Sequence, residues 1–187
     1  MVRMMEWTAE RAEQYAEKYG EYATNRLAVE ALTILPGSVV VDIGCGTGCA
    51  LRTVASRVRP GVLIGIDPVP RMLEIARKRA EQHPEGHRIE FCEAPAAQLP
   101  IDDGTADWVF AFDSIDHWVD VRAGLVEVQR ILTRRGRFVA VKDASIPDAD
   151  APQAFLGELE GAGLRMVDER ALSDGDVSCT LWICART

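Results

Sequence analysis

The chain has 187 residues, of which 48% are apolar, and it carries a formal charge of −8 with a pI near 4.9. This length suits one hydrophobic core, so we expect a single domain over residues 1–187. A net negative charge disfavours nucleic acid as a partner. No apolar run reaches the roughly 18 residues of a membrane span, and no signal pattern opens the chain. The sequence therefore predicts a cytoplasmic protein that does not bind membranes.

The cysteines argue for a reducing compartment. There are five, an odd number, and none forms a C-x-x-C pair. Cys45 and Cys49 flank glycines, whereas Cys179 and Cys184 fall in an expected strand. We expect reduced, mostly buried thiols and no metal site.

The first 37 residues predict two helices and a candidate lid. Residues 8–35 are rich in helix formers, with a break near Gly20 and a second helix over residues 25–35. Tyr15, Tyr19 and Tyr22 recur at i, i+4 and i+7, the spacing of one helix face. These tyrosines either pack the helix onto the domain or form a lid whose phenols reach a ligand.

From residue 38 onward, strands and helices alternate. We expect strands at 39–43, 62–67, 88–92, 106–112 and 137–141, and helices at 50–58, 70–82, 122–132 and 152–163. A turn at 134–136 ends the helix over 122–132. Two last strands, 165–172 and 177–185, are joined by a turn at 173–176 and close the sheet with an antiparallel edge. This order predicts an α/β fold, a seven-stranded, mostly parallel sheet with helices on both faces.

The most informative stretch is a glycine turn after the first strand. Residues 39–50 read VVVDIGCGTGCA, with Gly44, Gly46 and Gly48 at alternate positions. Such a turn between strand and helix is expected to leave backbone N–H groups facing a crevice at the carboxyl end of the sheet, where ligands bind. The alternative is a tight connection without a ligand.

Acids at the ends of later strands point to a nucleoside. Asp67 ends the second strand, 23 positions after Gly44, where a carboxylate suits the two hydroxyls of a ribose. The dinucleotide fingerprint is broken by Cys49, and no Gly-Lys-Ser/Thr follows for a phosphate loop. Asp42, just ahead of the turn, suits a ligand with an amino group rather than a pyrophosphate.

These motifs resemble the class I S-adenosylmethionine-dependent methyltransferases, in their small-molecule, UbiE-like (type 11) branch. The likeness begins with DIGCGTG and continues in order through GIDPVPRMLEIAR, LPIDDGTADWVF, DHWVD and VQRILTRRGRF, over roughly residues 39–141. It implies a Rossmann-like, doubly wound sheet over residues 38–187 and S-adenosylmethionine as cofactor.

The resemblance also implies roles at matching positions. The backbone of Gly44, Cys45 and Gly46 would cradle the methionine portion of the cofactor, and Asp42 would orient its amino end. Asp67 would hold the ribose. The adenine would lie against Pro68 and Met72, with the backbone near Ala96 and the Leu99 side closing its pocket. Phe112, Asp113 and Ser114 would line the methionine and acceptor side, and Tyr15 or Tyr19 would cover the cofactor.

A base is needed only if the acceptor arrives protonated, because the sulfonium methyl is already activated. Asp113, Asp116 and His117 cluster after the fourth strand, and we name His117 and Asp113 as the catalytic candidates. The alternative for His117 is a role in structure or cofactor packing. Trp118 either walls the pocket or packs in the core.

Two departures stand out. Related sequences usually carry an acid four residues before the Leu-Pro pair, and here that position is Pro95, with Glu93 nearby. Residues 142–151 form only a short loop, where larger relatives insert a substrate-binding cap.

The sequence thus predicts methyl transfer to an O, N, S or C nucleophile of a small molecule. The main alternative is a non-catalytic cofactor-binding or partner subunit, and a dehydrogenase is disfavoured by Cys49. A homodimer could complete an open pocket.

Overall fold

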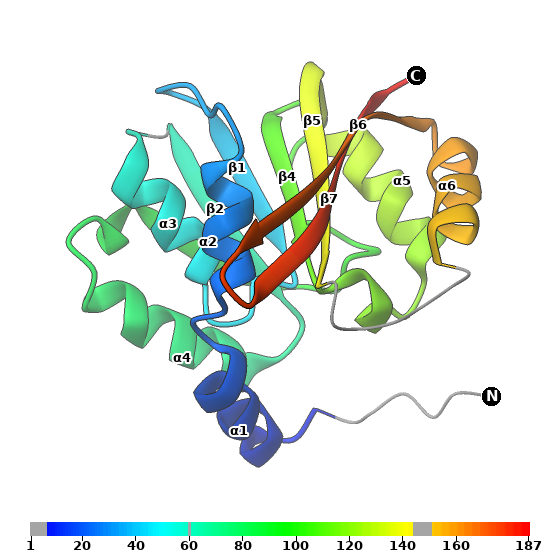
Figure 1. Cartoon of the computed structure of the whole chain (residues 1–187). Coiled ribbons are helices and arrows are strands. Elements are labelled where there is room, and N and C mark those ends of the chain that lie inside the picture. The colour runs from blue at the N-terminus through cyan, green and yellow to red at the C-terminus, as the bar shows by residue number, and fades with distance from the viewer. Residues whose placement is uncertain (1–6, 60, 144–150) are drawn as a thin grey trace.

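The computed structural model describes residues 7–59, 61–143 and 151–187, so the expected loop at 142–151 lies mostly outside the described residues. Within them a seven-stranded sheet has the order β3-β2-β1-β4-β5-β7-β6 (Figure 1). The strands are β1 (Val39–Ile43), β2 (Val62–Asp67), β3 (Ile89–Glu93), β4 (Ala106–Phe112), β5 (Leu132–Asp143), β6 (Leu164–Asp174) and β7 (Val177–Arg186). Pairing from β3 through β5 is parallel, and β7 is antiparallel to both neighbours. The predicted mixed sheet is confirmed.

Helices cover both faces of this sheet. They are α1 (Ala9–Tyr19), α2 (Ala23–Glu30), α3 (Cys49–Arg57), α4 (Pro70–Glu81), α5 (Val121–Ile131) and α6 (Ala151–Gly161), with short 3-10 helices η1 (Gly86–Arg88) and η2 (Ile115–His117). Val109 of β4 joins the buried cluster that contains Leu125 of α5, whereas the next residue, Phe110, joins the cluster that contains Leu51 of α3. Successive residues of a strand point to opposite faces of the sheet, so β4 contributes side chains to the buried cluster on each face.

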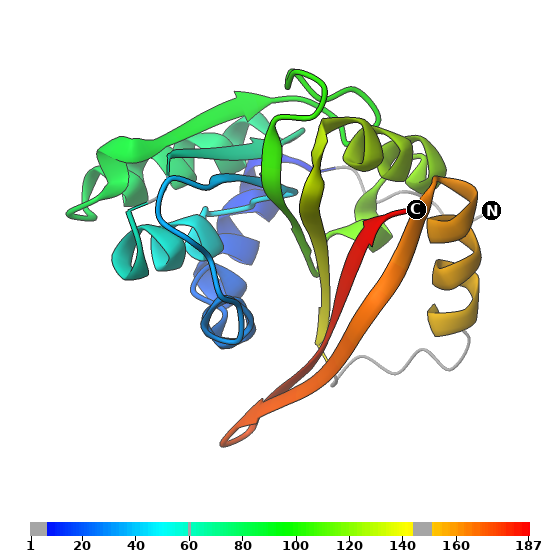
Figure 2. The same cartoon turned by 90° about the horizontal axis from the view of Figure 1, so that it is seen from above.

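The closing hairpin forms the expected antiparallel edge of the sheet. β7 lies between β5 and β6, and β6 is the outermost strand; Figure 2 shows the tip of this hairpin projecting from the sheet. The reason lies in the two sequences. β7 buries Leu181 and Cys184 completely, whereas β6 carries the charged run Asp168-Glu169-Arg170. An apolar strand is stabilised by two neighbours, and a charged strand protects an edge from further pairing.

Two elements, β5 and α2, differ from the sequence prediction by more than two residues at one end. Arg134, Arg135 and Gly136 do not form a separate turn, because β5 begins at Leu132, directly after α5. Ala106 pairs with Leu132 and Trp108 with Arg137, so the intervening residues of β5 form a bulge. The second helix was expected at residues 25–35, but α2 begins at Ala23 and ends at Glu30.

Candidate functional site

A cavity lies at the carboxyl ends of β1, β2 and β4, beside α1 and the start of α2. Of the predicted site residues, all but Asp42 and Leu99 line it: Tyr15, Tyr19, Gly44, Cys45, Gly46, Asp67, Pro68, Met72, Ala96, Phe112, Asp113, Ser114 and His117. The carboxyl ends of parallel strands are where open α/β sheets bind their ligands. The cavity therefore lies where the sequence predicts it.

The glycines of the turn are required by its backbone. Gly44, Gly46 and Gly48 have φ of 73°, 51° and 75°, a region that disfavours side chains. At Gly44 a Cβ would also lie 2.5 Å from the Cβ of Ser114, which follows β4. At Gly46 a Cβ would meet nothing within 4 Å, because this residue borders the open cavity. The turn thus allows two strand ends to approach while leaving room for a ligand.

Three N–H groups of the turn, which were expected to face the cavity, are hydrogen-bonded within the protein. Gly44 N and Cys45 N donate to the Ile66 carbonyl at 2.7 and 3.0 Å, and Gly46 N donates to Asp67 Oδ2 at 3.0 Å. The end of β2 lies alongside and supplies acceptors, and buried N–H groups take partners wherever these exist. The turn is therefore pre-formed by the protein itself.

Asp67 is buried at the end of β2, yet it retains capacity for a ligand. Its Oδ1 accepts from Val69 N at 2.9 Å, and its Oδ2 accepts from Gly46 N. Each carboxylate oxygen can accept a second hydrogen bond, so both remain suited to a pair of ribose hydroxyls. Burial raises the pKa of Asp67, partly offset by these two N–H donors.

Asp42 lies behind the turn rather than on the cavity wall. It pairs in register with Gly65 of β2 and Phe110 of β4, and its side chain is buried. Burial, followed by the charge of Asp67, raises the pKa of Asp42 to about 7. Asp42 therefore does not contact a ligand in the cavity directly, and it can act on one only by positioning the turn that follows it.

An aromatic series covers the cavity. The centroids of Trp7 and Tyr15 are 5.3 Å apart, those of Tyr15 and Tyr19 are 5.1 Å apart, and those of Tyr19 and Tyr22 are 5.7 Å apart. Tyr22 lies beyond Gly20 at the N-cap of α2, so the three tyrosines do not share one helix. All three nevertheless line the cavity, as does Trp7, for which no sequence signal existed.

Asn25, Thr47, Val69 and Val119 also line the cavity and were not predicted.

The N-terminal helices are fastened to the glycine turn and to α4. Thr47 Oγ1 donates to the carbonyl of Gly20, and Arg79 Nη2 donates to the carbonyl of Ala16 at 2.9 Å. Glu21 pairs with Arg79 at 2.7 Å and with the buried Arg52. A Cβ at Gly20 would lie 2.4 Å from Arg79 Nη1, so the chain passes close to α4 here. These contacts hold the aromatic cover against the cavity.

Asp113 has an unusual conformation and an unused acceptor. Its φ is +49°, in the left-handed region that non-glycine residues seldom occupy. Oδ1 accepts from Asp143 N at 2.8 Å, whereas Oδ2 is buried and receives no hydrogen bond from any described residue. Burial raises the pKa of Asp113 to about 6, with the Asp143 N–H opposing this shift and the Asp143 charge adding to it.

The neighbouring residues of η2 complete this end of the cavity. His117 lies with its ring 6.0 Å from that of Trp7. Trp118 lines the cavity, and its Nε1 is buried with no partner among the described residues. At Gly124 of α5 a Cβ would lie 2.5 Å from the Trp118 ring, so this glycine allows the ring to pack closely against α5.

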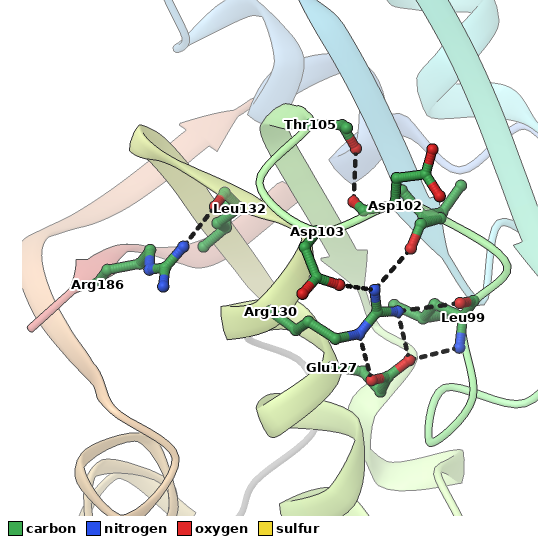
Figure 3. A network of polar contacts seen from close by, with 9 residues as sticks. Leu99, Asp102, Asp103, Thr105, Glu127, Arg130, Leu132 and Arg186 are labelled. Atoms are coloured by element: carbon green, nitrogen blue, oxygen red, sulfur yellow. Dashed lines mark hydrogen bonds and ion pairs between the residues drawn. The ribbon is translucent and has the colours of Figure 1, made fainter.

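Another wall of the cavity is formed by the loop between β3 and β4. Side chains of α5 bind this loop (Figure 3). Arg130 donates to the carbonyls of Leu99 and Ile101 at 3.0 and 2.7 Å, and it pairs with Asp103 and Glu127, each at 2.7 Å. Glu127 in turn accepts from Leu99 N at 2.7 Å. We call Arg130 and Glu127 the loop clasp.

The loop clasp fixes residues 99–103, which follow the cavity-lining part of the same loop. Ala94, Pro95 and Ala96 line the cavity. Leu99, expected to close the adenine pocket, does not line the cavity but is buried in the core cluster.

A doubly wound sheet with a glycine turn after β1 and an acid after β2 defines a nucleoside-binding site. Comparison with known proteins agrees. A family profile described as a methyltransferase domain matches residues 41–140. An O-methyltransferase of Pyrenophora dematioidea is 35% identical over 137 residues, which cover 70% of this chain and 51% of that protein.

The ubiquinone/menaquinone biosynthesis C-methyltransferase UbiE of Citrifermentans bemidjiense is 31% identical over 118 residues, 63% of this chain and 50% of that protein. The chain thus spans about half the length of the curated relatives it matches. A solved structure of a putative S-adenosylmethionine-dependent methyltransferase from Methanococcus maripaludis shares the fold, with a TM-score of 0.79 at 17% identity over 100% of this chain and 97% of that one. The protein belongs to the S-adenosylmethionine-dependent methyltransferase family.

No helix in the described residues is long and apolar enough to cross a membrane. No cluster of His, Cys, Asp and Glu in this part of the chain is arranged to hold a metal ion. All five cysteines are free, and only Cys92 is not fully buried.

Proposed function

We propose that the protein transfers a methyl group from S-adenosylmethionine to a nucleophilic atom of a small molecule. One observation carries this proposal: a single cavity brings together the glycine turn, the Asp67 carboxylate and the Asp113 carboxylate under an aromatic cover. Membership of the methyltransferase family supports it.

The cavity wall fits the cofactor. Asp67 has spare acceptor capacity for the ribose hydroxyls, and the open side of Gly46 leaves space for the methionine portion. Pro68 and Met72 would pack against the adenine, with Ala96 on the clasped loop opposite. S-adenosylmethionine, when bound, supplies a methyl group activated by the positive sulfonium. Tyr15 and Tyr19 would cover it, and Asp42 would act only through the turn.

The acceptor would lie toward Phe112, Asp113 and His117. Positioning the nucleophile in line with the methyl group contributes much of the rate acceleration, and a base assists where the acceptor carries a proton. Asp113 is the better candidate, because it has an unused acceptor atom and a pKa of about 6. His117 is the second candidate, because it lines the same cavity.

The printed names of the relatives support a small-molecule acceptor, since they include O-methyltransferases and a quinone-biosynthesis C-methyltransferase. A single domain over residues 1–187, a homodimer and a cytoplasmic location remain predictions of the sequence. No finding favours the alternative of a non-catalytic partner subunit.

The test is a transfer assay. The protein is incubated with S-adenosylmethionine labelled in its methyl group and with small molecules that carry hydroxyl, amine, thiol or activated carbon nucleophiles. We expect labelled product and a matching amount of S-adenosylhomocysteine with at least one class. Tight cofactor binding without transfer to any class would contradict the proposal and favour the non-catalytic alternative.

A further inference from the structure

Carboxylates are the main charged groups on the cavity wall. Its described residues include the carboxylates of Asp67 and Asp113 and the imidazole of His117, but no Lys or Arg. Lys142, the cation that acts on Asp113 from β5, is paired with Asp116. A negative wall repels carboxylates and phosphates, and it attracts cations. The cavity is therefore poorly suited to an anionic acceptor.

The two carboxylates differ in what they already bind. Asp67 receives two backbone N–H donors and, under the proposed function, the ribose. Asp113 receives one N–H donor on Oδ1, and no described residue satisfies the buried Oδ2. A buried carboxylate oxygen without a donor is costly, and a charged donor satisfies it best.

The walls near Asp113 are aromatic. Trp7, Tyr15, Tyr22 and Trp118 line the same cavity. Burial raises the pKa of Tyr15, and the charge of Asp113 is the second cause. The faces of such rings attract an ammonium group and also pack against an apolar body.

We infer that the methyl acceptor is a small amine with an aromatic or apolar body, and that the carboxylate of Asp113, which lines the cavity, receives its ammonium group. This inference rests on the proposed function and names the substrate class of the same site. In the reaction the ammonium gives one proton to the Asp113 carboxylate, and the freed lone pair forms an N–C bond to the methyl group. The C–S bond breaks with its electron pair left on sulfur, and the methylated nitrogen carries the positive charge.

The test uses three probes with the same aromatic body and different heads. 2-Phenylethylamine is positive, 2-phenylethanol is neutral and 3-phenylpropanoate is negative. Each is titrated by calorimetry at pH 7.5 into the whole protein, with and without saturating S-adenosylhomocysteine. We expect the amine to bind about tenfold or more tightly than the alcohol, as for a hydrogen bond to a charged group, and the carboxylate to bind least.

Asp113→Asn is the matched variant. Asparagine tolerates the left-handed conformation, and its amide oxygen can still accept from Asp143 N, so the fold is expected to persist. The preference for the amine should disappear in this variant. It should persist in Asp176→Asn, which removes a charge from the exposed turn between β6 and β7.

Equal binding of amine and alcohol by the wild-type protein, or an amine preference retained in Asp113→Asn, would overturn the inference. Either result could occur with S-adenosylhomocysteine bound normally, so the proposed function would survive. A failure of S-adenosylhomocysteine to bind would instead count against the proposed function, whereas the titrations without it would still decide the amine preference.

Discussion

At the scale of single residues, three aspartates in and behind the site are buried or partly buried, and burial disfavours the charged form of a carboxylate. Asp42, Asp67 and Asp113 each have a pKa raised mainly by burial. Asp42 is the clearest case, since it is buried in β1 and does not reach the cavity. Removing water from a carboxylate disfavours its charged form, so Asp42 opposes folding at neutral pH.

Asp42→Asn should therefore stabilise the protein in a pH-dependent manner. The pKa of Asp42 is about 7 in the folded protein and near 3.8 in the unfolded chain. Its contribution to stability is full below pH 4 and is lost as the pH rises to 7. Each pH unit between the two values is worth about 1.4 kcal/mol, so the variant should gain up to roughly 4 kcal/mol in unfolding free energy at pH 8.

Urea unfolding of both proteins at pH 5 and pH 8 measures this effect. The gain should be clearly smaller at pH 5, and Asp176→Asn should show no gain at either pH. An Asp42→Asn variant that differs from the wild type by the same amount at both pH values would refute the assignment.

At the scale of elements, the loop between β3 and β4 is held by the loop clasp. Ala94, Pro95 and Ala96 at the start of this loop line the cavity. The donors of Arg130 and the carboxylate of Glu127 fix the backbone at Leu99 and Ile101 from α5 (Figure 3). The clasp thus connects α5 to the loop whose first residues line the cavity.

Arg130→Gln should weaken S-adenosylhomocysteine binding roughly tenfold, because the loss of hydrogen bonds worth about 1–2 kcal/mol loosens the adenine wall. Calorimetric titration measures this change, and circular dichroism checks that the variant is folded. Arg134→Gln, which removes an exposed cation nearby, should bind like the wild type. A lower unfolding temperature with an unchanged dissociation constant would mean that the clasp serves stability alone.

The elements also show what a sequence can predict. Strand and helix periodicity, the glycine turn and the acids at strand ends are local signals, so β1, β2 and β4 were predicted with their observed bounds, and most of the predicted site residues lie around one cavity. The position of β7 between β5 and β6 depends on comparing two distant strands for burial, and the bulge in β5 depends on register with β4. The pairing of the turn N–H groups with Ile66 and Asp67 likewise needs the neighbouring strand in place.

At the scale of the whole molecule, the sheet and the N-terminal helices act together. The sheet brings the ends of β1, β2 and β4 to one edge (Figure 1). Contacts of Gly20, Glu21 and Tyr22 link the aromatic cover to the elements around that edge. Tyr22 contacts Asp143, whose N–H holds Asp113, so the cover and the acceptor side are joined by direct contacts. The N-terminal helices are thus part of the site as well as of the fold.

The central claim, that this cavity binds S-adenosylmethionine, is tested most directly by calorimetric titration with S-adenosylmethionine and S-adenosylhomocysteine. We expect micromolar binding of both by the wild-type protein. Asp67→Asn should weaken binding by about 1–3 kcal/mol if the carboxylate accepts from the ribose hydroxyls. A folded wild-type protein that binds neither compound, or an Asp67→Asn variant with an unchanged dissociation constant, would contradict the account.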